Sequence, residues 1–245
     1  MKCDCIIQAR LGSTRFPRKV LSMIDGKPLI QFIIDNLKRS EKLDRIVVAT
    51  TQNQLDDELC AYCDEHSIPY FRGSEENVLK RYIDTCSFYN CRDIVRVCSD
   101  NPFIDIQKLD NQIDHYFAKN ADYCTYSTKS GTPIILKPIG LFAEVVTYEA
   151  LKKSYELASE KNHFEHVTFF IYSNASLFNI ETISLEDHDD YRFTIDYPED
   201  LIFCNQVAKK ISGKHTVKNL LELLQQDREL RIANLDFSKT HKKAY

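Results

Sequence analysis

The sequence predicts one α/β domain organised around a mostly parallel sheet. Over the first 71 residues, short apolar or β-branched runs alternate with segments whose apolar residues recur at helical spacing. An order of strand, helix, strand, helix, strand is typical of parallel strands joined by crossover helices. A hydrophobic content of 43% and a charged content of 28% are those of a globular protein, and no repeat, low-complexity segment or linker divides the 245 residues.

The first half supplies five strands and four helices. The run at 45–50 is β-branched, as central parallel strands are, whereas 29–37 has apolar residues at helical spacing. Ser74 is placed to cap the third helix, and Pro102 fixes a turn after the fourth strand. The predicted strands are 5–7, 45–50, 68–71, 93–98 and 122–126, and the predicted helices are 29–37, 56–66, 75–89 and 106–117.

The second half continues the alternation after a loop. Gly131, Pro133 and Pro138 predict that loop over 127–138. Pro198, followed by two acidic residues, is typical of the first turn of a helix. The remaining predicted strands are 140–146, 178–183 and 192–195, and the remaining helices are 148–160, 164–172, 198–210 and 216–230. The domain is expected to span 1–237, with 238–245 as a polar C-terminal tail.

Charge and composition argue against several classes of function. A net charge of −4 and a pI near 6.0 argue against nucleic acid or an anionic membrane as the main partner. No run of 18 apolar residues is present and no apolar segment of signal-peptide length follows Lys2, so neither a membrane span nor a signal peptide is expected. Nine cysteines occur without a second pair to match Cys60 and Cys63, which favours reduced thiols in a cytoplasmic protein over a metal site.

A dense basic loop follows the first strand. Within ten residues it carries four cations around one glycine and two hydroxyls, namely Arg10, Gly12, Ser13, Thr14, Arg15, Arg18 and Lys19. Guanidinium groups bind phosphate oxygens in pairs, and the glycine lets backbone N–H groups approach an anion closely. Because loops after parallel strands lie at the edge where α/β sheets bind ligands, we expect a polyphosphate site here. The alternative is a solvated basic loop between a strand and a helix.

Two aspartates stand at the ends of later predicted strands. Asp100 precedes the turn fixed by Pro102, and Asp196 precedes the helix that starts at Pro198. Mg²⁺ prefers a few carboxylates together with substrate phosphates, so the pair predicts a magnesium site shared across one crevice. The alternatives are that Asp100 caps its own turn and that Asp196 caps the following helix.

These motifs, in this order, resemble those of a known family. Residues 9–21 (ARLGSTRFPRKVL) with 26–29 (GKPL) are similar to the opening motif of the cytidylyltransferases that activate acidic and surface-polysaccharide sugars. The group includes the CMP-ketodeoxyoctulosonate and CMP-acylneuraminate synthetases and, closest in wording, the spore-coat polysaccharide branch. The D-x-P turn at 100–102 and the T-x-D-x-P-E-D segment at 194–200 resemble two further family motifs. The resemblance spans 6–211 and implies a three-layer, Rossmann-like sheet of the nucleotide-diphospho-sugar transferase type.

The resemblance also implies a role for each matching residue. The expected catalytic residues, which would neutralise the triphosphate, are Arg10, Arg15 and Lys19, and the expected Mg²⁺ ligands are Asp100 and Asp196. The expected nucleotide-binding residues are these three cations together with Gln8, Ala9, Gly12, Ser13, Arg72 and Asn77. The expected sugar-side residues are Glu144, Glu165 and His166. For Arg72 and Asn77 the alternatives are a surface arginine and an exposed helix residue.

The implied reaction is an Mg²⁺-dependent transfer of a nucleoside monophosphate, usually from CTP, to a sugar or sugar phosphate with release of pyrophosphate. The family also implies a homodimer. Phe142 stands where the family usually has aspartate, so the identity of the sugar does not carry over. Two alternatives stay open: a glycosyltransferase with the same sheet, which needs to bind only the diphosphate of a nucleotide-sugar, and a non-catalytic nucleotide-binding module.

Overall fold

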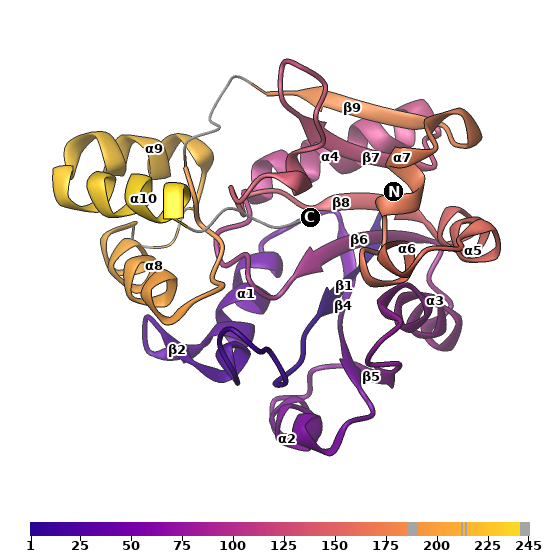
Figure 1. Cartoon of the computed structure of the whole chain (residues 1–245), viewed down its shortest axis with the longest axis horizontal. Coiled ribbons are helices and arrows are strands. Elements are labelled where there is room, and N and C mark those ends of the chain that lie inside the picture. The colour runs from indigo at the N-terminus through magenta and orange to yellow at the C-terminus, as the bar shows by residue number, and fades with distance from the viewer. Residues whose placement is uncertain (186–190, 212, 214, 241–245) are drawn as a thin grey trace.

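Seven strands form the central sheet of the computed structural model, which describes residues 1–185, 191–211, 213 and 215–240 (Figure 1). Their order across the sheet is β5-β4-β1-β6-β8-β7-β9, and only β8 runs antiparallel to its neighbours. The bounds are β1 Cys3–Gln8, β4 Leu43–Thr51, β5 Tyr70–Gly73, β6 Asp93–Cys98, β7 Tyr123–Ser127, β8 Glu144–Thr147 and β9 Ile180–Ser184. A hairpin of β2 (Met23–Ile24) and β3 (Lys27–Pro28) follows the basic loop. The predicted α/β class with a mostly parallel sheet is confirmed.

The α-helices of the described ranges number ten, and none of them is long and apolar enough to cross a bilayer. They are α1 Leu29–Leu37, α2 Asp57–Glu65, α3 Val78–Tyr89, α4 Ile106–Lys119, α5 Tyr148–Leu157, α6 Lys161–Glu165, α7 Phe169–Ser173, α8 Pro198–Ile211, α9 Val217–Gln226 and α10 Arg228–Thr240. Two predicted helices are each divided in two, 164–172 between α6 and α7 and 216–230 between α9 and α10. Asp227 divides the second, since its carboxylate accepts a hydrogen bond from Leu230 N and caps α10.

Other boundaries also differ from the sequence prediction by a few residues, as three examples show. Asn77, not Ser74, caps α3, because its side chain accepts a hydrogen bond from Lys80 N. The strand predicted at 140–146 begins only at Glu144. Helix α10 continues to Thr240, three residues into the predicted tail, and 241–245 lie outside the described residues.

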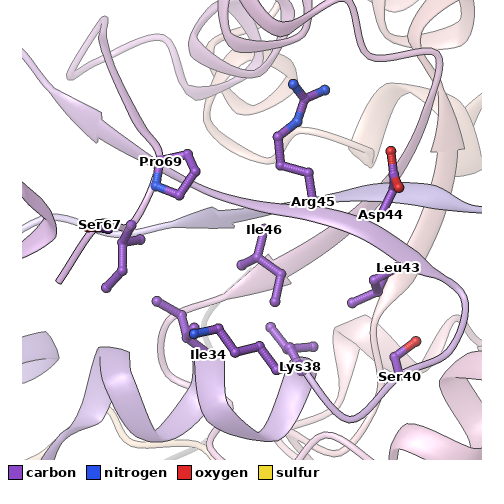
Figure 2. A pocket seen from close by; sticks show the side chains of 11 residues that line it. Ile34, Lys38, Ser40, Leu43, Asp44, Arg45, Ile46, Ser67 and Pro69 are labelled. Carbon is purple, nitrogen blue, oxygen red and sulfur yellow. The ribbon is translucent and has the colours of Figure 1, made fainter.

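The two ends of the strands differ in what they present. The parallel strands β1, β4, β5 and β6 end at one edge, where the loops that follow them gather. At the opposite edge a pocket of about 260 Å³ lies between α1 and the start of β4, where Ile34 and Lys38 face Leu43 and Ile46 (Figure 2). This pocket lies at the amino ends of the strands, so it does not belong to the basic loop.

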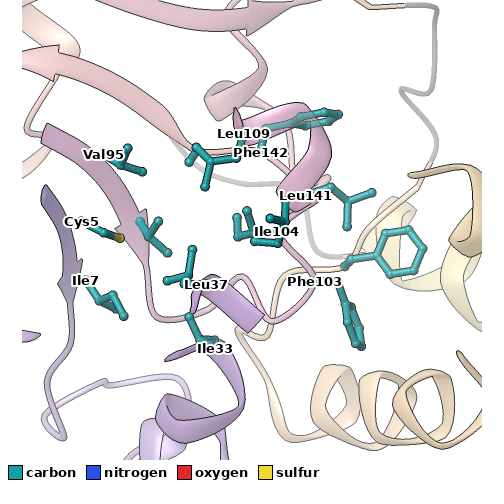
Figure 3. Packing of buried hydrophobic residues seen from close by; sticks show 14 of the residues in the cluster. Cys5, Ile7, Ile33, Leu37, Val95, Phe103, Ile104, Leu109, Leu141 and Phe142 are labelled. Atoms are coloured by element: carbon teal, nitrogen blue, oxygen red, sulfur yellow. The ribbon is translucent and has the colours of Figure 1, made fainter. Parts of the chain in front are cut away.

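Helices cover both faces of the sheet, which gives three layers. Side chains alternate between the faces along a strand. Ile7 and Val48 therefore belong to the core that α1 and α4 complete, whereas Ile6 and Ala49 belong to the core that α3 and α5 complete. Figure 3 shows the first of these cores, with Ile33 and other side chains of α1 packed against strand residues.

The cysteines are mostly core residues. Eight of the nine are buried. Burial raises the pKa of Cys63 and of Cys124 to about 12, so these thiols stay protonated at neutral pH. They act as small apolar side chains, which is the role that the sequence predicts.

The segment 192–195, predicted as a strand, joins neither of the two sheets that the described residues form. It is buried, and its backbone pairs with loops instead of a ladder. Phe193 N donates to Ile139 O at 3.2 Å, and Ile195 N donates to Asp100 O at 2.8 Å. An aromatic and β-branched run is compatible with either arrangement, because both bury extended backbone. The contact with Asp100 matters most, since it joins two segments that carry the predicted site.

His215 is a buried histidine just before α9, between two phenylalanine rings. Its ring centroid lies 5.3 Å from that of Phe32 and 5.2 Å from that of Phe103, and its buried Nδ1 has no hydrogen-bond partner in the part of the chain that the structure describes. Burial lowers the pKa of His215 to about 4, and Arg39 adds to this shift while Asp25 opposes it. The folded protein therefore favours the neutral His215 ring, and protonation of this ring destabilises the fold.

We expect His215→Phe to reduce the sensitivity of the fold to acid. Because the folded-state pKa lies below the unfolded value of 6.5, the stabilisation is complete above pH 6.5 and is lost as the pH falls toward 4. The free energy of unfolding is measured in urea at about pH 7 and at about pH 4.5. Between these two pH values it should fall by about 2–3 kcal/mol more in the wild type than in the variant. The exposed His66→Phe is the matched control. Equal pH dependence of wild type and His215→Phe would contradict this assignment.

Candidate active site

The basic loop after β1 is fixed at both ends by hydrogen bonds. Ala9 N donates to Ala49 O at 3.2 Å, so the ladder of β1 and β4 continues one residue into the loop. Leu11 is buried, and its N–H donates to the carboxylate of Asp56 at 2.6 Å. Arg18 N donates to Leu11 O at 2.9 Å and closes the loop. These bonds hold the cations of the loop at the carboxyl edge of the sheet.

Lys19 is the innermost cation of the loop and lies between two acidic segments. Its Nζ donates to Ile195 O at 2.7 Å, and only 11% of its side chain is exposed. The same Nζ lies 3.9 Å from Asp100 Oδ2 and 3.8 Å from Asp196 Oδ1. The two carboxylates, remote in sequence, therefore face one ammonium group. Asp100 Oδ2 and Asp196 Oδ1 are separated by no more than the sum of these two distances.

Gly140 allows the two acidic segments to meet. It has a φ of 70°, in the left-handed region that favours glycine. A Cβ at this position would lie 2.9 Å from Thr194 Cγ2 and 3.1 Å from Asn101 Oδ1. Because no side chain fits there, the glycine permits the close packing that accompanies the hydrogen bond between Ile195 N and Asp100 O.

Asp196 is a buried carboxylate with three cations around it. Its side chain is 3% exposed. Arg15 donates to Oδ1 at 2.6 Å and Arg192 donates to Oδ2 at 2.8 Å, while Lys19 adds its charge from 3.8 Å. Burial would raise the pKa of Asp196, but these three charges outweigh burial and lower it. The carboxylate is therefore ionised at neutral pH.

Arg192 and Asp200 fix the position of Asp196. The Arg192 side chain is 2% exposed and donates to Asp200 from Nε at 3.0 Å and from a terminal nitrogen at 2.9 Å. Asp200 also accepts hydrogen bonds from the backbone N–H groups of Asp196 and Tyr197. Sequence reasoning gave neither Arg192 nor Asp200 a role. The available signal was an arginine four residues before an aspartate, in a segment already singled out.

The two carboxylates differ in what their oxygens contact. Asp100 Oδ1 is buried and has no hydrogen-bond partner among the described residues, and a metal ion is one kind of ligand that would satisfy such an oxygen. Asp196 Oδ1 is bound by Arg15. Among the described residues, no three or more His, Cys, Asp or Glu side chains form a metal-binding group. Mg²⁺ commonly uses one or two carboxylates plus substrate phosphates, so the donor set of Asp100 and Asp196 is of the kind that suits this ion.

Arg10 lies at the exposed rim of the loop. Its guanidinium is 3.5 Å from Glu75 Oε1, and both side chains are more than one third exposed. Gly12 lies beside the same carboxylate, since a Cβ there would be 3.6 Å from Glu75 Oε1. Gly12, Ser13 and Gln8 are half-buried along the loop and the strand before it. Exposed ion pairs contribute little to stability, so Arg10 is free to exchange Glu75 for an anionic ligand.

Arg72 and Asn77 have structural partners. Arg72 forms an ion pair with Asp57 at 2.7 Å, and it donates to Thr51 O and Asn53 O at 2.9 Å each. Its guanidinium thus ties β5 to the loop that follows β4. Asn77 uses its side-chain oxygen to cap α3. Both residues are half-buried, so each combines its structural partners with partial exposure to solvent, and their binding to a nucleotide stays a prediction.

Glu144 lies inside the protein instead of lining an open surface. It is 1% exposed and forms an ion pair with Arg96 across β6 and β8. Its carboxylate also accepts hydrogen bonds from the hydroxyls of Tyr123 and Thr168. Arg96 in turn donates to Gln8 Oε1 at 3.2 Å. Arg96 and Gln8 therefore connect the Glu144 carboxylate to the strand that leads into the basic loop.

The E-H-V-T segment at 165–168 meets the sheet through its last residue. Thr168 binds Glu144, a contact that sequence reasoning missed, whereas Glu165 is exposed at the end of α6 and His166 follows it half-buried. Phe142 packs on Tyr126 at a centroid distance of 4.9 Å and belongs to the core of Figure 3. A buried aromatic side chain in this place supplies no charge to a bound sugar.

Comparisons with known proteins identify chains with similar sequence. Residues 5–236, most of the chain, match the sequence model of a family described as cytidylyltransferase. The spore coat polysaccharide biosynthesis protein SpsF of Bacillus subtilis is 34% identical over 232 residues, which are 91% of this chain and 93% of that protein. The 3-deoxy-manno-octulosonate cytidylyltransferase of Alteromonas mediterranea is 32% identical over 137 residues, which are 55% of this chain and 53% of that protein.

A solved structure gives the same result for the fold. A cytidylyltransferase from Leptospira borgpetersenii superposes with a TM-score of 0.85 at 26% sequence identity, covering 94% of this chain and 96% of that chain. The similarity therefore extends through the whole sheet and its helices. It confirms the three-layer, Rossmann-like architecture that the sequence motifs imply.

Proposed function

The chain belongs to the cytidylyltransferase family, and we propose that it transfers CMP from CTP to a sugar or sugar phosphate with release of pyrophosphate. Because it belongs to this family, the chain is a nucleotidyltransferase. We propose the identity of the nucleotide donor, the class of the acceptor and the use of a metal ion. One observation carries it. The ammonium group of Lys19, in the basic loop, lies within 3.9 Å of a carboxylate oxygen of both Asp100 and Asp196.

The proposal divides the work between cations and carboxylates. Arg10, Arg15 and Lys19 bind the triphosphate and neutralise the charge that develops on the departing pyrophosphate. Asp100 and Asp196 hold Mg²⁺, which when bound offsets the repulsion between two anionic reactants. Arg192 and Asp200 keep Asp196 in place. Catalysis then rests on positioning and electrostatics, and no side chain needs to act as a nucleophile.

The acceptor is a sugar for a surface polysaccharide or glycan. The similarity to a spore coat polysaccharide protein and to a sugar-acid cytidylyltransferase supports this class. Glu165 and His166, at the end of α6, are proposed to lie at the acceptor side or at a dimer contact. We further propose that the enzyme is a homodimer and that, because its donor is a nucleoside triphosphate, it works in the cytoplasm.

A substrate screen tests the proposal. The purified protein is incubated with each of four nucleoside triphosphates and Mg²⁺ against a panel of ulosonic acids and sugar 1-phosphates, and pyrophosphate is measured. We expect release that requires both CTP and an acceptor. A glycoside formed from a nucleotide-sugar, without pyrophosphate from any triphosphate, would instead support the glycosyltransferase alternative. Absence of all turnover would support a nucleotide-binding module.

A further inference from the structure

The three cations around Asp196 differ in how firmly they are held. Lys19 is mostly buried and donates to Ile195 O. Arg192 is buried and makes two hydrogen bonds to Asp200 in addition to its bond to Asp196. The side chain of Arg15 is 50% exposed, and in the described part of the chain its contacts are the Asp196 carboxylate and the ring of Tyr197, 5.5 Å away. Of the three, Arg15 can leave at the lowest cost.

We propose that Arg15 is an exchangeable occupant of the metal site. In the ligand-free protein it neutralises Asp196, and it moves to the triphosphate when a divalent cation takes Asp196 Oδ1. This inference rests on the proposed function, because it needs a triphosphate that draws Arg15 away. It adds that Arg15 pairs with Asp196 in the absence of ligands and with the triphosphate when the metal ion is bound.

The charges of the site explain why an occupant is needed. A carboxylate that is 3% exposed is costly to leave without enough compensating charge, and Arg15 supplies part of that charge at 2.6 Å. A divalent cation on the same oxygen would meet the guanidinium as a like charge at short range, so both cannot stay. Asp100 Oδ1, which is buried and has no hydrogen-bond partner in the described ranges, is the second oxygen that such a cation could bind.

The exchange makes the two ligands cooperative. A triphosphate offers Arg15 a new anionic partner and thereby frees Asp196 for the metal. By linkage, the metal frees Arg15 for the triphosphate to the same extent. Removing Arg15 should therefore have opposite effects on the two ligands. The affinity for the nucleotide should fall, whereas the affinity of the nucleotide-free protein for a divalent cation should rise.

Mn²⁺ binding to the nucleotide-free, full-length protein tests this, with free Mn²⁺ measured by electron paramagnetic resonance. We expect Arg15→Gln to bind Mn²⁺ about tenfold more tightly than the wild type, which corresponds to about 1.4 kcal/mol. The matched control is Arg18→Gln, which removes the same charge from the same loop at an arginine that pairs with exposed Glu58. It should bind as the wild type does. Adding Asp196→Asn to Arg15→Gln should abolish the gain.

Each outcome decides the matter. Equal Mn²⁺ affinity in the Arg15→Gln and Arg18→Gln proteins would overturn the exchange, as would a failure of every variant to bind Mn²⁺. These results are separate from the substrate screen. A wild type that releases pyrophosphate from CTP, together with an unchanged Arg15→Gln affinity, would leave the proposed function standing and remove only the exchange. A raised affinity without CTP turnover would support the exchange and remove the proposed function.

Discussion

Replacing Lys19 with methionine is expected to lower kcat/KM for CTP by about 10²- to 10³-fold. Methionine keeps an apolar chain that extends as far as Cε but removes the ammonium group that lies near both Asp100 and Asp196. Loss of one preorganised donor at developing negative charge typically costs this much. Steady-state release of pyrophosphate at a fixed acceptor concentration gives the value.

A control separates this effect from a general loss of charge. Lys27→Met makes the same substitution in the nearby hairpin, at a half-exposed lysine that pairs with Asp35. It should change kcat/KM less than about twofold, since exposed pairs contribute little. Thermal unfolding confirms that both variants are folded. A folded Lys19→Met protein that turns CTP over within about threefold of the wild type would remove Lys19 from the mechanism.

Arg192→Met is expected to destabilise the fold by about 3–5 kcal/mol. The substitution leaves Asp200 without its two guanidinium hydrogen bonds and takes one of the three cations from Asp196. Breaking a buried ion pair from one side costs this much, because the remaining charge stays buried without compensation. Urea unfolding at neutral pH measures the change.

The matched control is Arg45→Met, which removes a partly exposed arginine paired with Asp4. Arg45→Met should lower the free energy of unfolding by less than Arg192→Met does, because about a third of the Arg45 side chain is exposed to solvent. An Arg192→Met protein within about 1 kcal/mol of the wild type would show that the network around Asp196 is not needed for the fold. A destabilised variant that keeps full turnover would show that Arg192 does not position Asp196.

The regular part of the fold was predictable from local patterns. Helix α1 and strand β6 have the bounds that their patterns predict. In α1 the apolar residues recur at helical spacing and are buried on one side, and in β6 a short apolar run is buried in the sheet. The breaks at 166–168 and at Asp227 were not predictable from periodicity. At Asp227, a carboxylate that caps the start of α10 begins a new helix without interrupting the apolar spacing around it.

The site was predictable in outline only. Order along the chain placed the basic loop, Asp100 and Asp196 at segments that can meet at one edge of the sheet. It did not show that Asp196 follows an extended segment bound to the Asp100 turn, which depends on the space left by Gly140. Nor did it show that Glu144 is enclosed by Arg96, because partners on different strands are set by pairing across the sheet.

The most direct test of this account is the position of a metal in the presence of a nucleotide. Crystals grown with Mn²⁺ and a non-hydrolysable CTP analogue would locate the ion by its anomalous signal. We predict one peak within about 2.0–2.3 Å of an oxygen of Asp100 and an oxygen of Asp196, with Arg15 on the phosphates. A metal bound by the phosphates alone, without contact to either aspartate, would contradict the account.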